Sequence, residues 1–181
     1  MTNDADRPPI SRPLRVDDIR DGASGEIAAT EAEMAASAHL LDLRRLEGLI
    51  FTYRLRHGAA GCLRLTGSLK AAVTQSCVVS LDPVEASLDV PVELEFWPLS
   101  LIEELEASVE EPGSTGRFDW PEPIIDRKID LGPVIYESLA TALDPYPKRE
   151  GVSFDWSQGT PEAGGARQSG PFAALAKLKR R

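Results

Sequence analysis

Hydrophobicity alternates with a period of two over residues 49–97, and this pattern limits what the chain can fold into. Apolar residues hold the odd positions of 49–56 and 61–81, on either side of the turn sequence HGAAG. After Asp82-Pro83 the phase changes, and apolar residues hold the even positions of 84–97. Such runs are typical of antiparallel strands with one buried side and one solvent-facing side. The sequence therefore predicts a strand at 49–56 followed by a long hairpin of strands 61–81 and 84–97.

Helices are expected before and after this strand region. Thr30 and Glu33 have the spacing of a capping box, which predicts a helix over 31–42. Pro133 suits the first turn of a second helix over 131–143. The apolar stripe of that helix consists of Ile135, Leu139 and Leu143. Together these elements predict an α+β fold: a mostly antiparallel β-sheet with a long central hairpin, packed against two or three α-helices.

Shorter features complete the expected domain. Residues 11–19 predict a short edge strand, and DGASGE (21–26) predicts a loop. Gly67, inside a long alternating strand, predicts a bulge or a bend. Residues 100–128 are acidic and interrupted by Gly and Pro, which indicates a mobile excursion with a helical turn at its start.

The chain is expected to contain one folded domain. Residues 14–156 form this single α+β domain, preceded by a disordered leader at 1–13, which is polar and rich in Pro. A flexible linker follows at 157–170, and PFAALAKLKRR (171–181) predicts a short basic C-terminal helix.

The net charge of −9 conceals two surfaces of opposite sign. Residues 71–126 contain thirteen acidic side chains and one basic side chain, so the rest of the chain is net positive. Such asymmetry is informative about partners, although not about the fold. No apolar run approaches the roughly 20 residues needed to span a bilayer, and the N-terminus lacks the apolar core of a signal peptide. We therefore expect a cytoplasmic location, no membrane partner and no small-molecule substrate.

Cys77 raises the question of a metal site or a nucleophile. A structural zinc site needs about four ligands at paired spacings, but Ser80 stands three residues after Cys77, and neither His39 nor His57 has ligand spacing. The alternation places Cys77 among inward-pointing strand residues, where a cysteine acts as a small apolar group. A core residue is the main interpretation; an incidental thiol, a metal ligand and a nucleophile are the alternatives. Cys77→Ser should then lower stability by about 1–3 kcal/mol, and Cys77→Ala by less.

The sequence shows no catalytic residue, no metal ligand set and no cofactor motif, so we expect a protein that is not an enzyme. The basic residues on the predicted wet face of the sheet are Arg54, Arg56, Arg64 and Lys70. They form a cationic cluster suited to phosphates, and they are candidate RNA-binding residues. The alternative interpretation is an ordinary solvated face.

Three stretches in order resemble the YceD family of bacterial large-ribosomal-RNA accumulation proteins. They are GSLKAAVTQSCVVSLDPVEA, IDLGPVIYESLATALDPYP and PFAALAKLK. The residues that match the family motifs are Cys77, Asp130, Glu137, Pro145, Pro171 and Phe172. Many family members have further cysteines that suggest a metal site, but this chain has Ser80 and KREG (148–151) at those places, so metal binding is not carried over.

The resemblance implies a non-enzymatic ribosome-assembly factor that supports accumulation of 23S ribosomal RNA, by binding precursor RNA or a pre-ribosomal particle. The alternative is an adaptor whose acidic segment 100–126 holds a basic large-subunit ribosomal protein.

The C-terminal cations are further candidates for RNA binding: Lys177, Lys179, Arg180 and Arg181. They lie off the apolar stripe of the predicted helix, so they should not contribute to packing. We expect that replacing all four with Gln weakens association with pre-ribosomal particles and leaves the melting temperature nearly unchanged. Cosedimentation with particles measures the first effect and a thermal melt the second. Association equal to that of the parent protein would remove these residues from the RNA-binding set.

Overall fold

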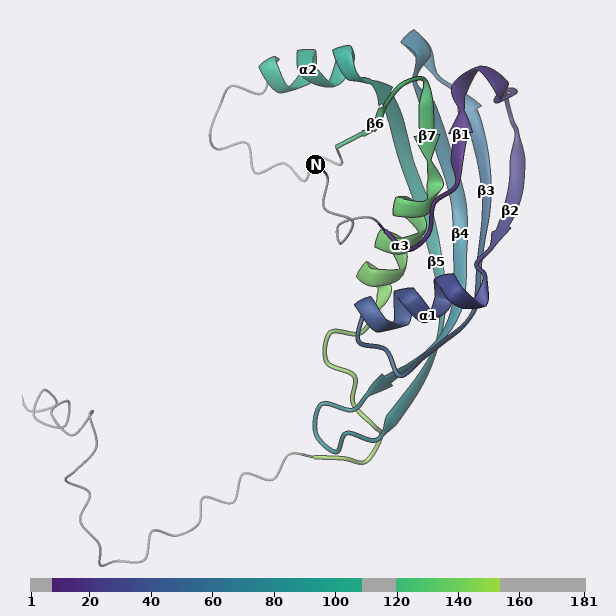
Figure 1. Cartoon of the computed structure of the whole chain (residues 1–181). Coiled ribbons are helices and arrows are strands. Elements are labelled where there is room, and N and C mark those ends of the chain that lie inside the picture. Colours follow the sequence, from purple (N-terminus) through teal and green to yellow (C-terminus); the bar gives the residue numbers. More distant parts are fainter. Residues whose placement is uncertain (1–7, 109–119, 154–181) are drawn as a thin grey trace, which may run out of the picture.

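The computed structural model describes residues 8–108 and 120–153 (Figure 1). The fold class is α+β, as predicted, with a mostly antiparallel sheet of five strands, a separate strand pair and three helices in these ranges. The predicted linker (157–170) and C-terminal helix (171–181) lie outside the described residues. Each described helix is too short or too polar to cross a lipid bilayer.

The large sheet has the strand order β2-β3-β4-β5-β6. Its members are β2 (Ser24–Ala28), β3 (Arg45–His57), β4 (Leu63–Ser76), β5 (Pro83–Pro98) and β6 (Glu122–Ile124). Neighbours are antiparallel except β5 and β6, which are parallel. The separate pair joins β1 (Pro13–Arg15) to β7 (Lys128–Asp130). The helices are α1 (Glu31–Leu40), α2 (Leu99–Ser108) and α3 (Leu131–Ala142), and 3₁₀ turns lie at Val16–Asp18 and Ala59–Gly61.

The long central hairpin is confirmed as β4 and β5. Their register is unbroken from Leu63 opposite Phe96 to Ser76 opposite Pro83. β3 adds a third long antiparallel strand beside β4. The inward residues of β4 are at most 6% exposed: Leu63, Leu65, Leu69, Ala71 and Val73. The alternation in the sequence therefore identified the buried side of these strands correctly.

One side of the large sheet carries the whole covering layer. α1, α3 and the β1–β7 pair lie on that side (Figure 1). The core between the layers includes residues at most 1% exposed, among them Phe51, Leu55, Leu65, Leu69, Ile135 and Leu139. Burying each such side chain contributes about 1.5–3 kcal/mol. No element of residues 8–108 and 120–153 covers the other side, which we call the open face. It consists of the even-numbered residues of β3 from Ile50 onward, the even-numbered residues of β4 and the odd-numbered residues of β5.

The N-terminal segment fastens the covering layer. The Arg12 guanidinium donates to both Glu33 oxygens (2.6 and 2.8 Å), and the Arg12 N–H donates to the Asp130 carboxylate (2.5 Å). Asp130 also caps α3 by accepting the N–H of Gly132 (2.9 Å). Ile10 is fully buried, which corrects the prediction that the disordered leader extends to residue 13. Residues 8–13 instead pack on the domain because Ile10 has an apolar core to enter.

Both predicted helix starts are found. The Thr30 hydroxyl accepts the N–H of Glu33, and the Glu33 carboxylate accepts the N–H of Thr30, so the capping box is complete. Pro133 lies in the first turn of α3. The observed helices end at Leu40 and Ala142, one or two residues before the predicted ends.

Three predictions about the chain between the long elements are wrong in part. The segment DGASGE contains the start of β2, because hydrogen bonding to β3 orders it as an edge strand. The strand predicted over 61–81 ends at Ser76, where a turn begins. The acidic region 100–128 holds most of the ten-residue helix α2, then β6 and the first residue of β7; residues 109–119 lie outside the described chain.

The bulge lies at Gly48 rather than at Gly67. The β3–β4 register shifts there, and Gly48 has a φ of 60°, which a glycine adopts without strain. Gly67 keeps a regular register for a different reason. A Cβ on Gly67 would lie 2.5 Å from the Thr52 carbonyl oxygen and 3.0 Å from the Phe51 ring. Its missing side chain therefore makes room for the Phe51 ring against the backbone.

Gly67→Ala should destabilise the protein by about 1–3 kcal/mol, because the added methyl group overpacks the interface between β3 and β4. Gly58→Ala is the matched control, since a Cβ there meets nothing closer than 3.5 Å and the backbone is extended. Urea unfolding of both variants measures the difference. Equal stability of the two variants would contradict the packing role assigned to Gly67.

Candidate functional site

The four basic residues predicted from the sheet pattern lie together on the open face. Arg56 stands directly opposite Arg64 across β3 and β4, and Arg54 stands opposite Thr66. Lys70 follows further along β4, and all four side chains are exposed. The alternation of β3 and β4 alone positions them. Their shared face is therefore confirmed, whereas RNA binding by them stays a prediction.

Two of these cations are neutralised by acidic residues of β5. Arg64 forms an ion pair with Glu93 and lies 3.8 Å from a Glu95 oxygen. Lys70 lies 3.5 Å from an oxygen of Asp89, its direct neighbour across the strands. These pairs follow from the register of β4 and β5, which places the acidic face of one strand beside the basic face of the other.

Arg54 and Arg56 have no carboxylate partner among the described residues. They lie on β3, one strand further from β5, where Ser24 of β2 is the neighbour of Arg54. The open face is thus divided into a basic half and an acidic half. The basic half has two unpaired guanidinium groups and also the exposed carboxylate of Glu26, which stands opposite Thr52. The residues of the acidic half are Glu85, Asp89, Glu93 and Glu95.

The residues that match the family motifs are spread over the domain. Asp130 caps α3, Glu137 is exposed on the same helix, and Pro145 is exposed in the segment that follows. The other two motif residues and the four C-terminal cations lie outside the described residues: Pro171, Phe172, Lys177, Lys179, Arg180 and Arg181.

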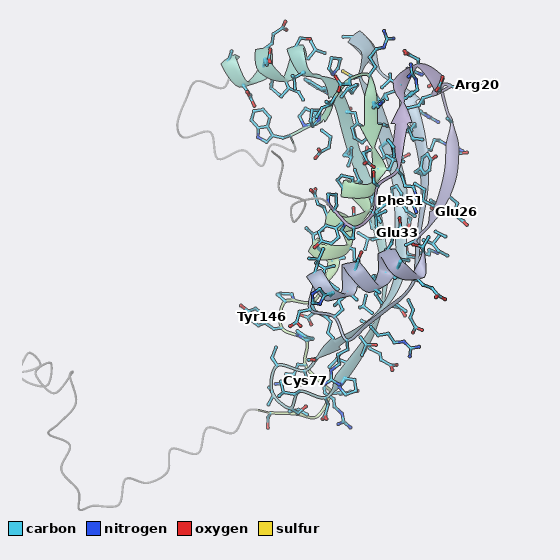
Figure 2. The ribbon with its side chains drawn as sticks, in the orientation of Figure 1. Arg20, Glu26, Glu33, Phe51, Cys77 and Tyr146 are labelled. Carbon is cyan, nitrogen blue, oxygen red and sulfur yellow. The ribbon has the colours of Figure 1, made fainter. Side chains whose placement is uncertain are left out.

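Cys77 lies at the end of the sheet remote from α2, immediately after β4 (Figure 2). The side chain is fully buried, as predicted, but it is in a turn and not in a strand. The turn is held against the segment after α3, because the Val78 N–H donates to the Pro147 carbonyl (2.9 Å). Arg149 adds an ion pair with Asp82 (2.8 Å).

The Cys77 sulfur accepts hydrogen bonds from both segments. The donors are the N–H groups of Arg149 (3.4 Å) and Ser80 (3.5 Å). The bond from the Arg149 backbone, followed by those from the side chain and backbone of Ser80, lowers the pKa of Cys77 from 9.0 to about 6, while burial acts in the opposite direction. The interpretation of Cys77 as a buried residue is confirmed. Its sulfur is also a hydrogen-bond acceptor that joins two segments far apart in the sequence.

We next asked whether Cys77 could belong to a metal site. Within residues 8–108 and 120–153, no three His, Cys, Asp or Glu side chains are arranged to hold a metal ion. Cys62, the other thiol, is half-buried, and burial raises its pKa. The basic half of the open face is thus the candidate site.

A second charged region, between β6 and α3, was not predicted from the sequence. Glu122 on β6 is partly buried, and burial raises the pKa of its carboxyl group, with a further contribution from the charge of Glu137. Both side chains line one cavity. The only usable sequence signal was Pro91 of the neighbouring strand β5, since a proline inside an alternating strand indicates a sheet edge. It does not identify the two glutamates themselves.

The chain was compared with protein-family models, curated proteins and solved structures. A family model described as large ribosomal RNA subunit accumulation protein YceD matches residues 65–179, more than half of the chain. Neither a curated protein nor a solved structure matches. The matched region begins in β4, includes Cys77 and α3, and continues beyond the last described residue.

The hydrogen bonds at Cys77 predict pH-dependent stability. Since the pKa of the thiol is lower in the folded protein than in the unfolded chain, its contribution is complete above pH 9 and is lost as pH falls toward 6. Wild type should therefore exceed Cys77→Ala in melting temperature at pH 9, by a margin that shrinks by pH 6.

Cys77→Ser is the control, because its hydroxyl oxygen restores an acceptor for the two N–H groups but does not ionise. It should be more stable than Cys77→Ala, the reverse of the order expected for an apolar site. A difference in melting temperature that does not change with pH would contradict a lowered pKa of Cys77.

Proposed function

The chain belongs to the YceD family, and on that premise we propose that it is a non-enzymatic ribosome-assembly factor that supports accumulation of 23S ribosomal RNA. The family description supports a ribosome-related role. The proposed molecular act is binding of precursor RNA, free or within a pre-ribosomal particle, through the basic half of the open face.

The observation that carries the RNA contact is the pair of unpaired guanidinium groups, Arg54 and Arg56. Arginine side chains bind phosphate oxygens through two parallel N–H donors. A guanidinium already bound to a carboxylate must break that pair first, as Arg64 would have to. Arg54 and Arg56 need break no such pair, and no described element stands over them. They are therefore the strongest phosphate ligands of the four.

The acidic half of the open face limits where RNA can bind. Carboxylates of β5 repel phosphates, so an RNA backbone on this face is confined to the side of β2 and β3. Contacts to phosphate groups carry little sequence information. Selectivity for one RNA would then require shape or other parts of the chain, such as the C-terminal cations.

The contacts of the two histidines, His39 and His57, support a non-enzymatic role. The His57 ring nitrogen Nε2 is bonded to the Ile19 carbonyl (2.8 Å), and His39 has no carboxylate or thiol partner in the described chain. A general base needs an adjacent nucleophile or substrate group. Neither histidine has a described nucleophile as partner.

An adaptor role is the second candidate. α2 exposes the carboxylates of Glu103, Glu104 and Glu106, which have no cationic partner in the described chain. Such a surface attracts basic proteins and accelerates their encounter. A basic large-subunit ribosomal protein is the partner proposed for this role.

The RNA contact is tested with two double variants of the full chain, each of which removes two positive charges. Arg54→Gln/Arg56→Gln removes the unpaired cations, and Arg64→Gln/Lys70→Gln removes the paired ones. Filter binding of a 23S precursor fragment is measured over a range of salt concentrations. The first variant should lower the salt slope of log K by about 1.4, since each phosphate contact on a single strand contributes about 0.7. The second should change the slope by less than half as much.

Thermal melts show whether both variants are folded. Equal losses in the two variants would indicate a response to net charge alone and would contradict the assigned site. An unchanged slope in both variants would exclude the open face as the RNA contact.

A further inference from the structure

One edge of β5 lacks a neighbouring strand over most of its length. β6 pairs only with Phe96–Pro98, so the edge over residues 83–95 has no strand partner in the described chain. A free edge presents backbone N–H and C=O groups that a strand from another chain can pair with. Pro91, near the middle of this edge, is tolerated there because no neighbouring strand requires its N–H.

The free backbone groups belong to the odd-numbered residues of β5. Pro91 stands opposite Ser68 of β4, and the Ser68 carbonyl accepts the Thr52 hydroxyl on the β3 side (3.4 Å). Successive residues of a strand turn their backbone groups to alternate edges. Since Ser68 turns its carbonyl toward β3, its partner Pro91 turns its backbone groups away from β4. Glu93 and Glu95, two and four residues further on, therefore direct their N–H groups to the same free edge.

A groove runs along this edge, between β5 and α3. One cavity of about 470 Å³ is lined by Val90 and Leu94 of β5 and by Glu137 and Thr141 of α3. A second cavity of about 350 Å³ shares Glu137 and continues to Glu122. Val134 lines both cavities, and Trp120 also lines the first. We call these two cavities together the β5–α3 groove.

The charges of the groove are negative and largely uncompensated. Glu122 and Glu137 both line it, and neither has an ion pair in the described chain. Burial and the nearby charge of Glu137 raise the pKa of the Glu122 carboxyl group. Lys128 also lines the second cavity, and it forms no ion pair with either glutamate in the described chain. On the other side of the edge, Glu93 faces the open face. A strand beside β5 would thus meet carboxylates on both of its sides.

We propose that the β5–α3 groove binds an extended, Lys- and Arg-bearing segment of a partner protein, which pairs with the free edge of β5. Alternate side chains of such a segment point to Glu122 and Glu137 on one side and to Glu93 on the other. Val134 and Leu94 accommodate the aliphatic stems of those lysines and arginines. The same carboxylates exclude nucleic acid. The site is separate from the proposed RNA contact, which uses charges of opposite sign on β3.

The test uses the full chain and a fluorescein-labelled peptide of alternating arginine and threonine, long enough to span residues 83–95. Binding is measured by fluorescence anisotropy. Glu122→Gln/Glu137→Gln should weaken binding by about tenfold, the effect of two partly exposed charge pairs. Glu26→Gln/Glu150→Gln is the control with the same change in net charge, because both carboxylates are exposed and lie away from the groove. It should change binding by less than about twofold.

Thr141→Lys provides a second variant that the fold tolerates, since Thr141 is exposed in the last turn of α3. It places a cation in the groove and should also weaken binding. Hydrogen exchange at the Glu93 and Glu95 amides should slow on addition of the peptide. Failure of the wild-type chain to bind the peptide, or equal weakening by the groove and control variants, would overturn the proposal.

Two other occupants are outcomes of the same experiment. If the chain's own basic C-terminus fills the groove, replacing Lys177, Lys179, Arg180 and Arg181 with Gln should tighten peptide binding by about tenfold or more, and that result would overturn the assignment to a partner. If Glu122→Gln/Glu137→Gln weakens binding of the 23S fragment as much as binding of the peptide, the groove is an RNA site instead. If Arg54→Gln/Arg56→Gln loses RNA binding but binds the peptide as the wild type does, the peptide site is independent of the RNA contact.

Discussion

The odd-numbered apolar residues of β4, and of β3 beyond the Gly48 bulge, are buried against one covering layer, and the rest of the molecule follows from that one-sided burial. The apolar residues of α3 complete the core on the same side, so the even-numbered residues of these strands face outward. A sheet covered on one side has no packing reason to keep its outer residues apolar. Charged residues can therefore occupy the open face without loss of core stability, and in this chain they divide into a basic half and an acidic half.

The covering layer is held by a small polar cluster rather than by packing alone. Arg12 connects Glu33 of α1 to the Asp130 cap of α3, and the Arg12 bonds lower the pKa of Glu33 to about 2. Gly132 allows the Ile10 carbonyl to approach α3, since a Cβ at that position would lie 2.0 Å from its oxygen. These contacts hold the start of α3 against the N-terminal segment.

Local patterns in the sequence predicted the three long strands and the helices α1 and α3, but not β2 or β6, and not the contacts between distant segments. Alternation identified β3, β4 and β5, and the Thr30–Glu33 spacing identified the start of α1. Gly67 and Gly48 could not be distinguished, because one responds to a ring from the neighbouring strand and the other to a register shift. The same limit applies to the site. The alternation of a strand predicts that the four basic residues share one face. It does not predict which of them are neutralised, because that depends on the register of β4 against β5. The role of Cys77 depends on Arg149, seventy-two residues away in the chain.

The central claim is that one side of the sheet meets RNA through β3 while the edge of β5 meets protein. Ultraviolet cross-linking in cells, followed by mass spectrometry of the cross-linked peptides, tests it directly. We predict nucleotide adducts on the peptides that contain Arg54 and Arg56, and none on β5 or α3. Nucleotide adducts concentrated on the residues of the β5–α3 groove, with none on β3, would contradict the account.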